Sequence, residues 1–189
     1  VFRSLHMKLM LILLLLITSL MAVVGAFLTS SVTSFYIDTF YQQMDDVFGA
    51  DNAGFIADLR SAAAEEDGAQ RIRNMLETVT GKLGIDYRAR NYFVLDGLSG
   101  TYLADCGSAG SEALPREQSG NLLTARNAIA QRDETLVGDS SSLTADYMDV
   151  AVPIFNGSHA YIIYVLDTKD TVSGLNAQLV MIILQALLI

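Results

Sequence analysis

Two long apolar stretches without a charged residue lie near the two ends of the sequence. The first, Leu9 to Leu28, has 20 residues. A helix of that length is about 30 Å long, which is enough to cross the hydrocarbon core of a bilayer. The second stretch follows Asp170 and is still apolar at Ile189. The pattern predicts two transmembrane helices, at residues 9–28 and 171–189, the second of them truncated, with a domain at residues 29–170 between them.

The first stretch is interpreted as a retained membrane anchor rather than a cleaved signal peptide. The apolar core of a signal peptide usually has about 7–15 residues and ends in small residues at an A-x-A-like site. Here the stretch is longer and continues into the aromatic pair Phe35 and Tyr36. Arg3 and Lys8 precede it, and no acidic residue does. We therefore expect residues 1–8 in the cytoplasm and the central domain outside the cell.

Apolar residues continue at helical spacing beyond the first stretch. They are Val32, Phe35, Phe40, Met44 and Val47. Neither Gly nor Pro interrupts them before Gly49, so the membrane helix is expected to run unbroken into an exterior helix. The apolar stripe of that helix needs a partner, either the domain's own sheet or the same helix of a second chain. We expect a homodimer formed through this helix.

The remainder of the central segment changes from helical to strand periodicity. Three helices are expected, over residues 52–68, 72–83 and 121–132. Asp51 or Asn52 should cap the first, Gly68 should end it, and Gly84 should end the second. Four strands are expected in two hairpins, 92–95 with 101–104 and 147–154 with 159–166, the latter turning at Asn156-Gly157. A final helix should begin near Lys169. This order predicts an α+β domain built on an antiparallel sheet.

Almost all of the charge lies in the central segment. It holds all 21 acidic residues and 10 of the 12 basic ones, which leaves a formal charge of −11. That balance excludes a nucleic-acid-binding role, which needs a basic surface. His6 and His159 are the only histidines and Cys106 is the only cysteine, so there is no His/Cys metal-ligand spacing and no intrachain disulfide. We interpret Cys106 as a structural thiol, because the neighbouring Asp105 disfavours a reactive thiolate.

Two acidic clusters are the remaining candidates for cation binding. They are Asp45-Asp46 with Asp51, and Glu65–Asp67. Clustered carboxylates without His or Cys suit a hard cation such as Ca²⁺ or Mg²⁺. The alternative is a solvated surface, and Glu65–Asp67 is predicted at the carboxyl end of a helix, where the helix dipole disfavours negative charge. No metal ligand and no cofactor is assigned within the chain, and no catalytic set is found.

Three segments resemble the sensor end of bacterial membrane histidine kinases. The opening FRSLHMKLMLILLLLI resembles the start of the cell-wall-regulating kinases of Gram-positive bacteria. The segments NYFVLDGLSGTYLADC and YMDVAVPIFNGSHAYIIYVLDT resemble the first and the closing hairpins of extracytoplasmic PAS-like single Cache (PDC) domains. The resemblance implies such a domain in a bacterial cell membrane, with its last strand acting as the mechanical link to the second membrane helix.

The same resemblance implies that the full protein is an ATP-dependent, autophosphorylating histidine kinase with a response regulator as its partner. ATP and Mg²⁺ would belong to a kinase domain that this chain does not contain, because no phosphoacceptor-His or ATP-binding motif is present. We therefore expect stimulus sensing and transmembrane signalling. The alternatives are the ectodomain of a chemoreceptor or of a cyclic-dinucleotide enzyme, or a membrane-tethered module that binds cell-wall material or a protein and has no catalytic output.

Six side chains of the predicted sheet are candidates for ligand binding. They are Arg88, Arg90, Tyr92, Tyr147, Asp149 and Tyr161. Side chains alternate along a strand, so Arg88, Arg90 and Tyr92 share one face, whereas Tyr147 and Asp149 lie opposite the apolar residues of their strand. Tyr161 is expected near the last two. Two arginines with three tyrosines suit a small molecule that carries a carboxylate. The alternative is that the six are ordinary solvent-facing residues of a half-exposed sheet.

Overall fold

The computed structural model describes residues 5–107, 110, 114, 119–140, 147–157 and 159–188. They fall into two compact units. The helical unit holds the described residues of Val1–Tyr36 and Asp170–Ile189, and the domain is Ile37–Lys169. Helix α1, Leu5–Phe48, is one helix of 44 residues that begins in the helical unit and ends in the domain. The prediction that the apolar stretch continues unbroken into the domain is confirmed.

The helical unit contains the first part of α1 and helix α6, Asp170–Leu188. Among the described residues, one helix is long and apolar enough to cross a membrane by length and composition. Its apolar window lies near the amino terminus, has a mean hydropathy of 2.8 and is only 6% buried. Within this unit α6 contacts α1, where Asn176 Nδ2 donates a hydrogen bond to Thr33 Oγ1 at 3.2 Å.

The domain is built on a four-stranded sheet with the order β2-β1-β4-β3. The strands are β1 Arg90–Asp96, β2 Tyr102–Asp105, β3 Met148–Asn156 and β4 His159–Asp167. Every neighbouring pair is antiparallel. Both predicted hairpins are therefore confirmed, with strand ends that differ from the prediction by a few residues. The predicted turn at Asn156-Gly157 is displaced by one residue, because Asn156 still pairs with His159 and the two-residue loop begins at Gly157. Strand β4 is central, since it pairs with β1 on one side and β3 on the other.

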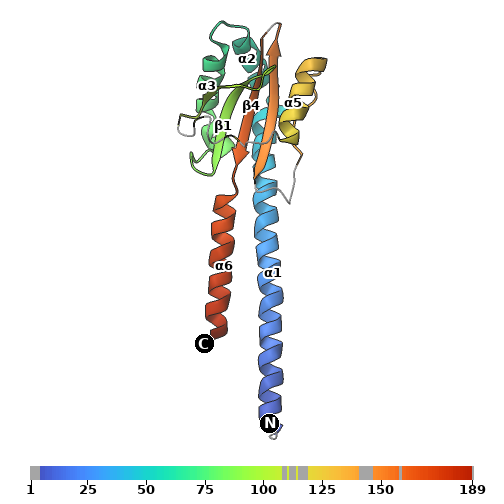
Figure 1. The fold of residues 1–189 in the computed structure, drawn as a ribbon, viewed down its shortest axis with the longest axis vertical. Helices are drawn as coiled ribbons and strands as arrows, with labels where there is room; N and C mark the ends of the chain where they lie inside the picture. The colour runs from blue at the N-terminus through green and yellow to red at the C-terminus, as the bar shows by residue number, and fades with distance from the viewer. Residues whose placement is uncertain are drawn as a thin grey trace. The chain divides into compact units, whose positions relative to one another are not determined.

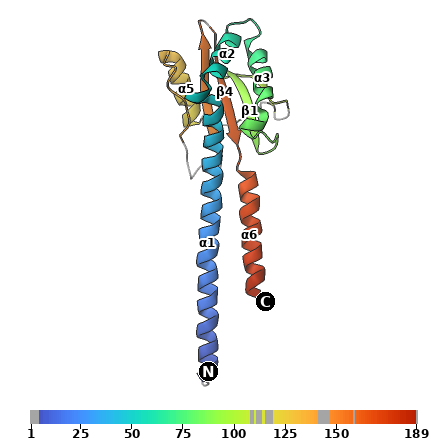
Figure 2. The same cartoon turned by 180° about the vertical axis from the view of Figure 1, so that it is seen from behind.

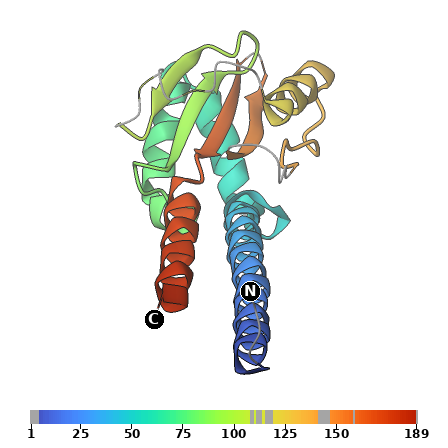
Figure 3. The ribbon, with the colours of Figure 1, turned by 60° about the horizontal axis from the view of Figure 1, so that its bottom comes forward.

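Helices cover both faces of this sheet (Figures 1 and 2). Helix α5, Gly120–Gln131, packs on β3 and β4 from one side. Helices α2, Ala53–Ala63, and α3, Gly68–Thr78, pack from the other (Figure 3). We call these sides the α5 face and the α3 face. Strands β1, β3 and β4 are therefore buried over most of their length, and β4 is buried from Tyr161 to Asp167, whereas Leu103 of the edge strand β2 is exposed.

Side chains of α5 and of the strands form a hydrophobic cluster on the α5 face. Its fully described members are Phe93, Leu95, Ala125, Ile129, Ala151, Ile162, Tyr164 and Leu166. The strand register places Tyr92, Val94, Val150, Val152, Ile163 and Val165 on the α3 face. Such residues match the β-branched and aromatic composition that predicted the strands.

Two details of the predicted helices are wrong. The helix predicted over residues 52–68 ends at Ala63, and the one predicted over residues 72–83 begins already at Gly68, because the chain turns at residues 64–67. Asp67 is consequently the N-cap residue of α3, where the helix dipole favours a carboxylate rather than opposing it. Asn52 precedes α2 but makes no side-chain cap there, and instead its amide donates to Val47 O of α1 at 3.0 Å.

The helix predicted over residues 72–83 is also interrupted near its end. Helix α3 stops at Thr78, and a separate turn, α4, covers Thr80–Leu83. Gly84 follows with a φ of 65°, the left-handed conformation that glycine adopts most easily and that commonly ends a helix. The predicted stop at Gly84 is therefore confirmed.

Candidate functional site

The six predicted ligand-binding residues do not form one site. The pairing of Arg90 with Asp167, Tyr92 with Val165 and Ile154 with Tyr161 places Arg90, Tyr92 and Tyr161 on the α3 face. Tyr147 packs against the cluster on the α5 face, and Asp149 lies on that face too. The expectation that Tyr161 lies near Tyr147 and Asp149 is wrong, because the sheet separates them.

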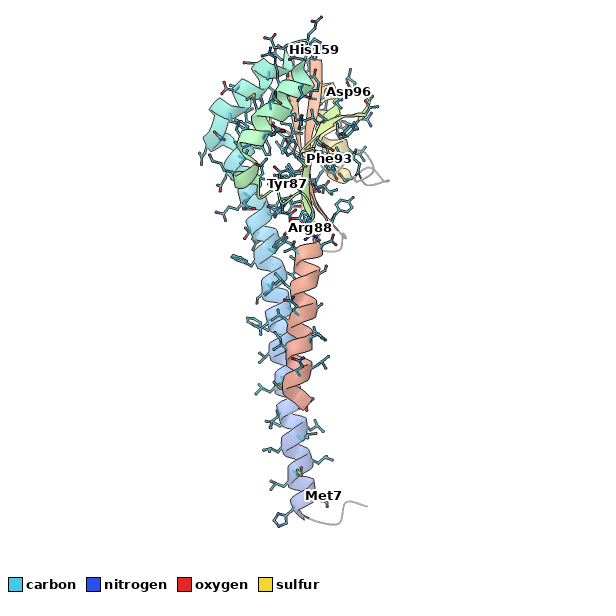
Figure 4. The ribbon with its side chains drawn as sticks, turned by 90° about the vertical axis from the view of Figure 1, so that its left-hand side faces the viewer. Met7, Tyr87, Arg88, Phe93, Asp96 and His159 are labelled. Atoms are coloured by element: carbon cyan, nitrogen blue, oxygen red, sulfur yellow. The ribbon has the colours of Figure 1, made fainter. Side chains whose placement is uncertain are left out.

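Arg88 is the exception among the six. It is exposed in the turn before β1, at the opposite end of the strand from Asp96 (Figure 4). The other five are buried or half-buried, so the alternative of a half-exposed sheet is also wrong. A ligand contact by any single one of the six stays a prediction, but the register excludes one pocket lined by all of them.

Arg90 is instead the centre of a buried ion pair at the end of the sheet where β1 begins and β4 ends. Its side chain is 6% exposed and that of Asp167 is 0% exposed. Arg90 Nε donates to Asp167 Oδ2 at 2.8 Å. Arg90 Nη1 donates to Gln43 Oε1 at 2.6 Å and to Leu83 O at 3.0 Å. The ring of Phe40 lies 4.8 Å from Arg90 Cζ, within cation–π range.

This ion pair joins four elements that are distant in the sequence. Gln43 and Phe40 belong to α1, Leu83 ends α4, Arg90 begins β1 and Asp167 ends β4. Removing one partner of a buried ion pair leaves an uncompensated charge, which typically costs about 3–5 kcal/mol. The packing of α1 against the central strand is therefore sensitive to this one contact.

Local backbone geometry makes room for the guanidinium and holds its strand. A Cβ atom on Gly84 would lie 2.5 Å from Arg90 Nη1, so the glycine both ends α4 and leaves space for the side chain. Asp86 Oδ1 accepts the backbone N–H groups of Arg88 at 2.9 Å and Arg90 at 2.8 Å. Partial burial alone raises the pKa of Asp86, but these N–H donors and the charge of Arg90 outweigh it and hold that pKa below its usual value.

Asp167 is also tied to the chain that follows it. Lys169 N donates to Asp167 Oδ1 at 2.8 Å, and Thr168 N donates to Ala89 O at 2.9 Å. Lys169 has a φ of 58°, and helix α6 begins at the next residue. Both carboxylate oxygens are thus used, one by the guanidinium and one by the backbone that leaves the domain.

A second buried carboxylate, Asp149, lies on the α5 face. Asn121 Nδ2 donates to Asp149 Oδ1 at 2.9 Å, and the Tyr164 hydroxyl donates to Asp149 Oδ2 at 3.0 Å. Burial, followed by the charge of Asp149, raises the pKa of Tyr164. Asn121 Oδ1 in turn accepts Ser140 N at 2.9 Å and Ser140 Oγ at 2.7 Å. Asn121 therefore fastens the segment before residue 141 to β3.

A groove of about 390 Å³ lies beside the last turns of α1. Its lining comes from α1, the turn that follows it, residues 137–139 and β3. The lining residues are Ile37, Asp38, Tyr41, Met44, Asp45, Phe48, Gly49, Val137, Asp139 and Val150. A shallower hollow of about 420 Å³, partly lined by Tyr161, lies by α3 and β2. Among the described residues, no group of three or more His, Cys, Asp or Glu side chains is arranged to hold a metal ion.

Comparison with known proteins identifies no relative. No protein-family model matches the chain, and no curated protein or solved structure matches it either. The function must therefore be argued from the residues themselves.

Sequence reasoning named Arg90 but missed its partners. Asp167 ends the most apolar strand and Arg90 begins the strand that pairs with it, so opposite charges at matching ends of antiparallel strands were a usable signal. Gln43 had no comparable signal, because 47 residues separate it from Arg90. Cys106 is buried and its thiol donates to Asn91 Oδ1 at 3.3 Å, a setting that suits the structural role assigned to it.

Proposed function

We propose that this chain is the sensory part of a bacterial membrane receptor, a homodimeric sensor histidine kinase. In this proposal residues 29–170 form an extracytoplasmic PAS-like single Cache domain, and residues 9–28 and 171–189 are its membrane helices. The kinase domain, its ATP and Mg²⁺, and the response regulator belong to parts of the full protein beyond these residues. The α+β architecture with an antiparallel sheet is compatible with that domain type.

One observation carries the proposal. Helix α1 continues from its apolar segment into the domain without a break, and Arg90 binds its Gln43 to Asp167 at the end of β4. Helix α6 starts three residues after Asp167. The two segments proposed to cross the membrane are therefore connected, inside the domain, through one guanidinium. A module that only tethered a binding domain would have no need of such a connection and would tolerate flexible linkers.

The proposed mechanism is a change between two packings of α1 and β4. A stimulus acts only if it contacts the two packings with different affinity. The Arg90 ion pair favours one of them, because its donors fit Gln43, Leu83 and Asp167 together. A shift of β4 relative to α1 would move the start of α6 in each protomer by a small translation or rotation, which is the signal.

Basal output provides the test of this coupling. Residues 1–189 are fused to the output half of an autophosphorylating kinase, and phosphorylation is measured in membranes without any stimulus. We expect Arg90→Gln and Asp167→Asn to change basal phosphorylation. Arg71→Gln is the matched control, because it removes a guanidinium whose pair with Asp67 is exposed. Folded, membrane-inserted variants that all phosphorylate like the control would overturn the proposed transmission.

Membrane topology is tested separately with single cysteines. Cys106 is replaced by Ser, and a cysteine is introduced at exposed Asp58 in the domain or at Ser4 in the amino terminus. The proposal predicts that a membrane-impermeant maleimide labels the Asp58→Cys protein in intact cells and the Ser4→Cys protein only after lysis. The reverse pattern, or labelling of both in intact cells, contradicts the proposed orientation.

A further inference from the structure

The groove beside α1 has the size and lining of a small-molecule site. Its volume of about 390 Å³ falls within the range of roughly 300–1,000 Å³ that is usual for ligand pockets. Such pockets combine an apolar wall with a few polar groups that orient the ligand. Here the wall consists of side chains that are buried or half-buried, namely Ile37, Met44, Phe48, Val137 and Val150.

The charged groups at this groove all have the same sign. Asp38 and Asp45 lie on α1, two turns apart on the face that also presents Tyr41, and Asp139 faces them from the segment before β3. All three carboxylates are exposed. In the part of the chain that the structure describes, none of the three forms an ion pair with a cationic side chain. No described cationic side chain therefore neutralises their negative potential.

Tyr41 lies in the lining of the groove. Burial raises its pKa to about 12, followed by the negative charges of Asp149, which does not line the groove, and of Asp139, which does. Among the described residues, the Tyr41 hydroxyl makes two long hydrogen bonds, 3.4 Å to Ser140 O and 3.5 Å to Asp149 O. Bonds of that length are weak, so the hydroxyl can turn to accept a hydrogen bond from a donor in the groove without losing much.

We propose that this groove binds a small organic cation, an amine or guanidine attached to an apolar body. The apolar body would lie against Met44, Phe48 and Val150, and the cationic group would lie among the carboxylates near the Tyr41 hydroxyl. Anionic ligands are disfavoured by three unneutralised carboxylates. A bare metal ion is disfavoured because the described carboxylates do not converge as a metal-holding group.

Occupancy of the groove would act on the same turns of α1 as the Arg90 ion pair. Tyr41 and Met44 line the groove, and Phe40 and Gln43, each one residue earlier along the helix, contact Arg90. The inference deepens the proposed sensory function and rests on it for its biological meaning. Binding itself, however, is measured without any output domain.

The test uses the 189-residue chain in lipid nanodiscs and three probes of one shape. They are phenethylammonium, the neutral 2-phenylethanol and the anionic 3-phenylpropionate. Saturable binding is measured by calorimetry, and the heat from empty nanodiscs is subtracted to remove partition into lipid. We expect phenethylammonium to bind most tightly, with an affinity that falls as salt is added, because exposed charges are screened. Equal affinity for the amine and the alcohol, or no saturable binding of the amine, overturns the inference.

Substitutions in the groove test whether phenethylammonium binds there. Asp139→Asn and Asp45→Asn each remove one carboxylate from the groove and should weaken phenethylammonium binding by about three- to fivefold, the effect of one solvent-accessible charge pair. Asp58→Asn is the matched control, because this exposed aspartate on α2 is outside the groove. Val137→Trp should fill the groove and remove binding. Equal weakening by Asp58→Asn, or unchanged binding in both Asp45→Asn and Asp139→Asn, contradicts the site.

The outcomes separate the two proposals. If phenethylammonium does not bind while Arg90→Gln still changes basal phosphorylation, the ligand assignment fails and the transmission proposal stands. If phenethylammonium binds and the Arg90 and Asp167 variants leave output unchanged, the groove is a binding site and the signalling route is wrong. The Asn variants preserve side-chain size, so a change in affinity with an unchanged unfolding temperature reports the lost charge and not misfolding.

Discussion

In the β3–β4 hairpin, each face of the sheet buries one carboxylate, and the two lie at nearly the same level. The two carboxylates are stabilised by different kinds of partner. Asp167 lies on the α3 face opposite Met148, and Asp149 lies on the α5 face opposite Leu166. Asp167 is bonded to a guanidinium and to a backbone N–H. In the described residues around Asp149 the donors are neutral, the Asn121 amide and the Tyr164 hydroxyl.

The difference shows what each carboxylate connects. Hydrogen bonds from neutral groups are directional but modest, and at Asp149 they fix α5 and the segment before residue 141 to an edge strand. A buried ion pair contributes little net stability but is costly to break, which makes it a sharper constraint on geometry. That constraint is placed where α1 meets the strand that precedes α6.

The largest expected loss of stability comes from breaking the Arg90–Asp167 ion pair on the α3 face. Arg90→Met leaves Asp167 buried without its cation and should destabilise the protein by about 3–5 kcal/mol in urea unfolding. The double variant Arg90→Met/Asp167→Leu should recover most of that loss, because neither charge remains buried. A double variant as unstable as Arg90→Met would show that the ion pair is not the reason.

Removing the neutral hydrogen-bond donors to Asp149 on the α5 face should cost less stability. Asn121→Ala removes both amide donors to Asp149 and the acceptor for Ser140, and should destabilise the protein by about 1–3 kcal/mol. Hydrogen exchange should show the change chiefly at Ser140 and in β3. Asn127→Ala, at an exposed position of the same helix, is the control. If Asn121→Ala cost as much as Arg90→Met, the contrast between the two faces would be removed.

The contribution of Asp86, which binds the backbone of Arg90, to stability should be smaller than that of Asn121, and its pH dependence has a defined sign. Because the pKa of Asp86 is lowered in the folded protein, its contribution to stability is present above the unfolded value of about 3.9 and is lost as the pH falls through the folded value. Asp86→Asn should therefore cost about 1 kcal/mol or less at pH 7, after allowance for solvent screening. The difference between the wild type and the variant in urea unfolding should shrink as the pH falls below about 3.9, and a difference that grows on acidification would contradict the assignment.

The smallest effect on stability is expected for the hydrogen bonds from Tyr41 of α1 to the backbone of Ser140 and Asp149. Tyr41→Phe removes two hydrogen bonds of 3.4 and 3.5 Å and should change the unfolding free energy by less than about 0.5 kcal/mol. Gln43→Leu, two residues later on α1, removes the acceptor for Arg90 and should cost clearly more. If Tyr41→Phe were the more damaging change, α1 would be held mainly by its contacts with β3 and the segment before residue 141 rather than by Arg90.

Local patterns predicted the elements of this fold well. The run from Tyr161 to Leu166 and the Asn-Gly turn defined the closing hairpin, and the uninterrupted stripe to Val47 defined α1. The helix boundary at residues 64–67 was missed because Ala-Glu-Glu-Asp has good helical propensity and Gly68 was the first visible break. Burial on both faces was missed because it depends on where α2, α3 and α5 pack, which no local pattern states.

The expectation that Tyr161 lies near Tyr147 and Asp149 was wrong because of the strand register. In a hairpin with a two-residue loop, the turn fixes which residues of the two strands share a face. Asn156 pairs with His159, which puts Tyr161 beside Ile154, on the side away from Asp149. The predicted turn at Asn156-Gly157 would place Tyr161 beside Val152 instead, but on the same face of the sheet, so its separation from Asp149 could already be predicted from the sequence. The Arg90–Gln43 bond, in contrast, depends on packing between distant segments and had no signal in the sequence.

The contacts of α1 with Arg90 also depend on the number of residues between them along the helix. Each residue of an α-helix advances the side-chain direction by about 100°, so Phe40 and Gln43, three residues apart, share the side of α1 that contacts Arg90. One residue inserted between Phe40 and Gln43 would turn Gln43 about a quarter-turn away from that side. Within the domain, the spacing along α1 therefore matters as much as the identity of the two side chains.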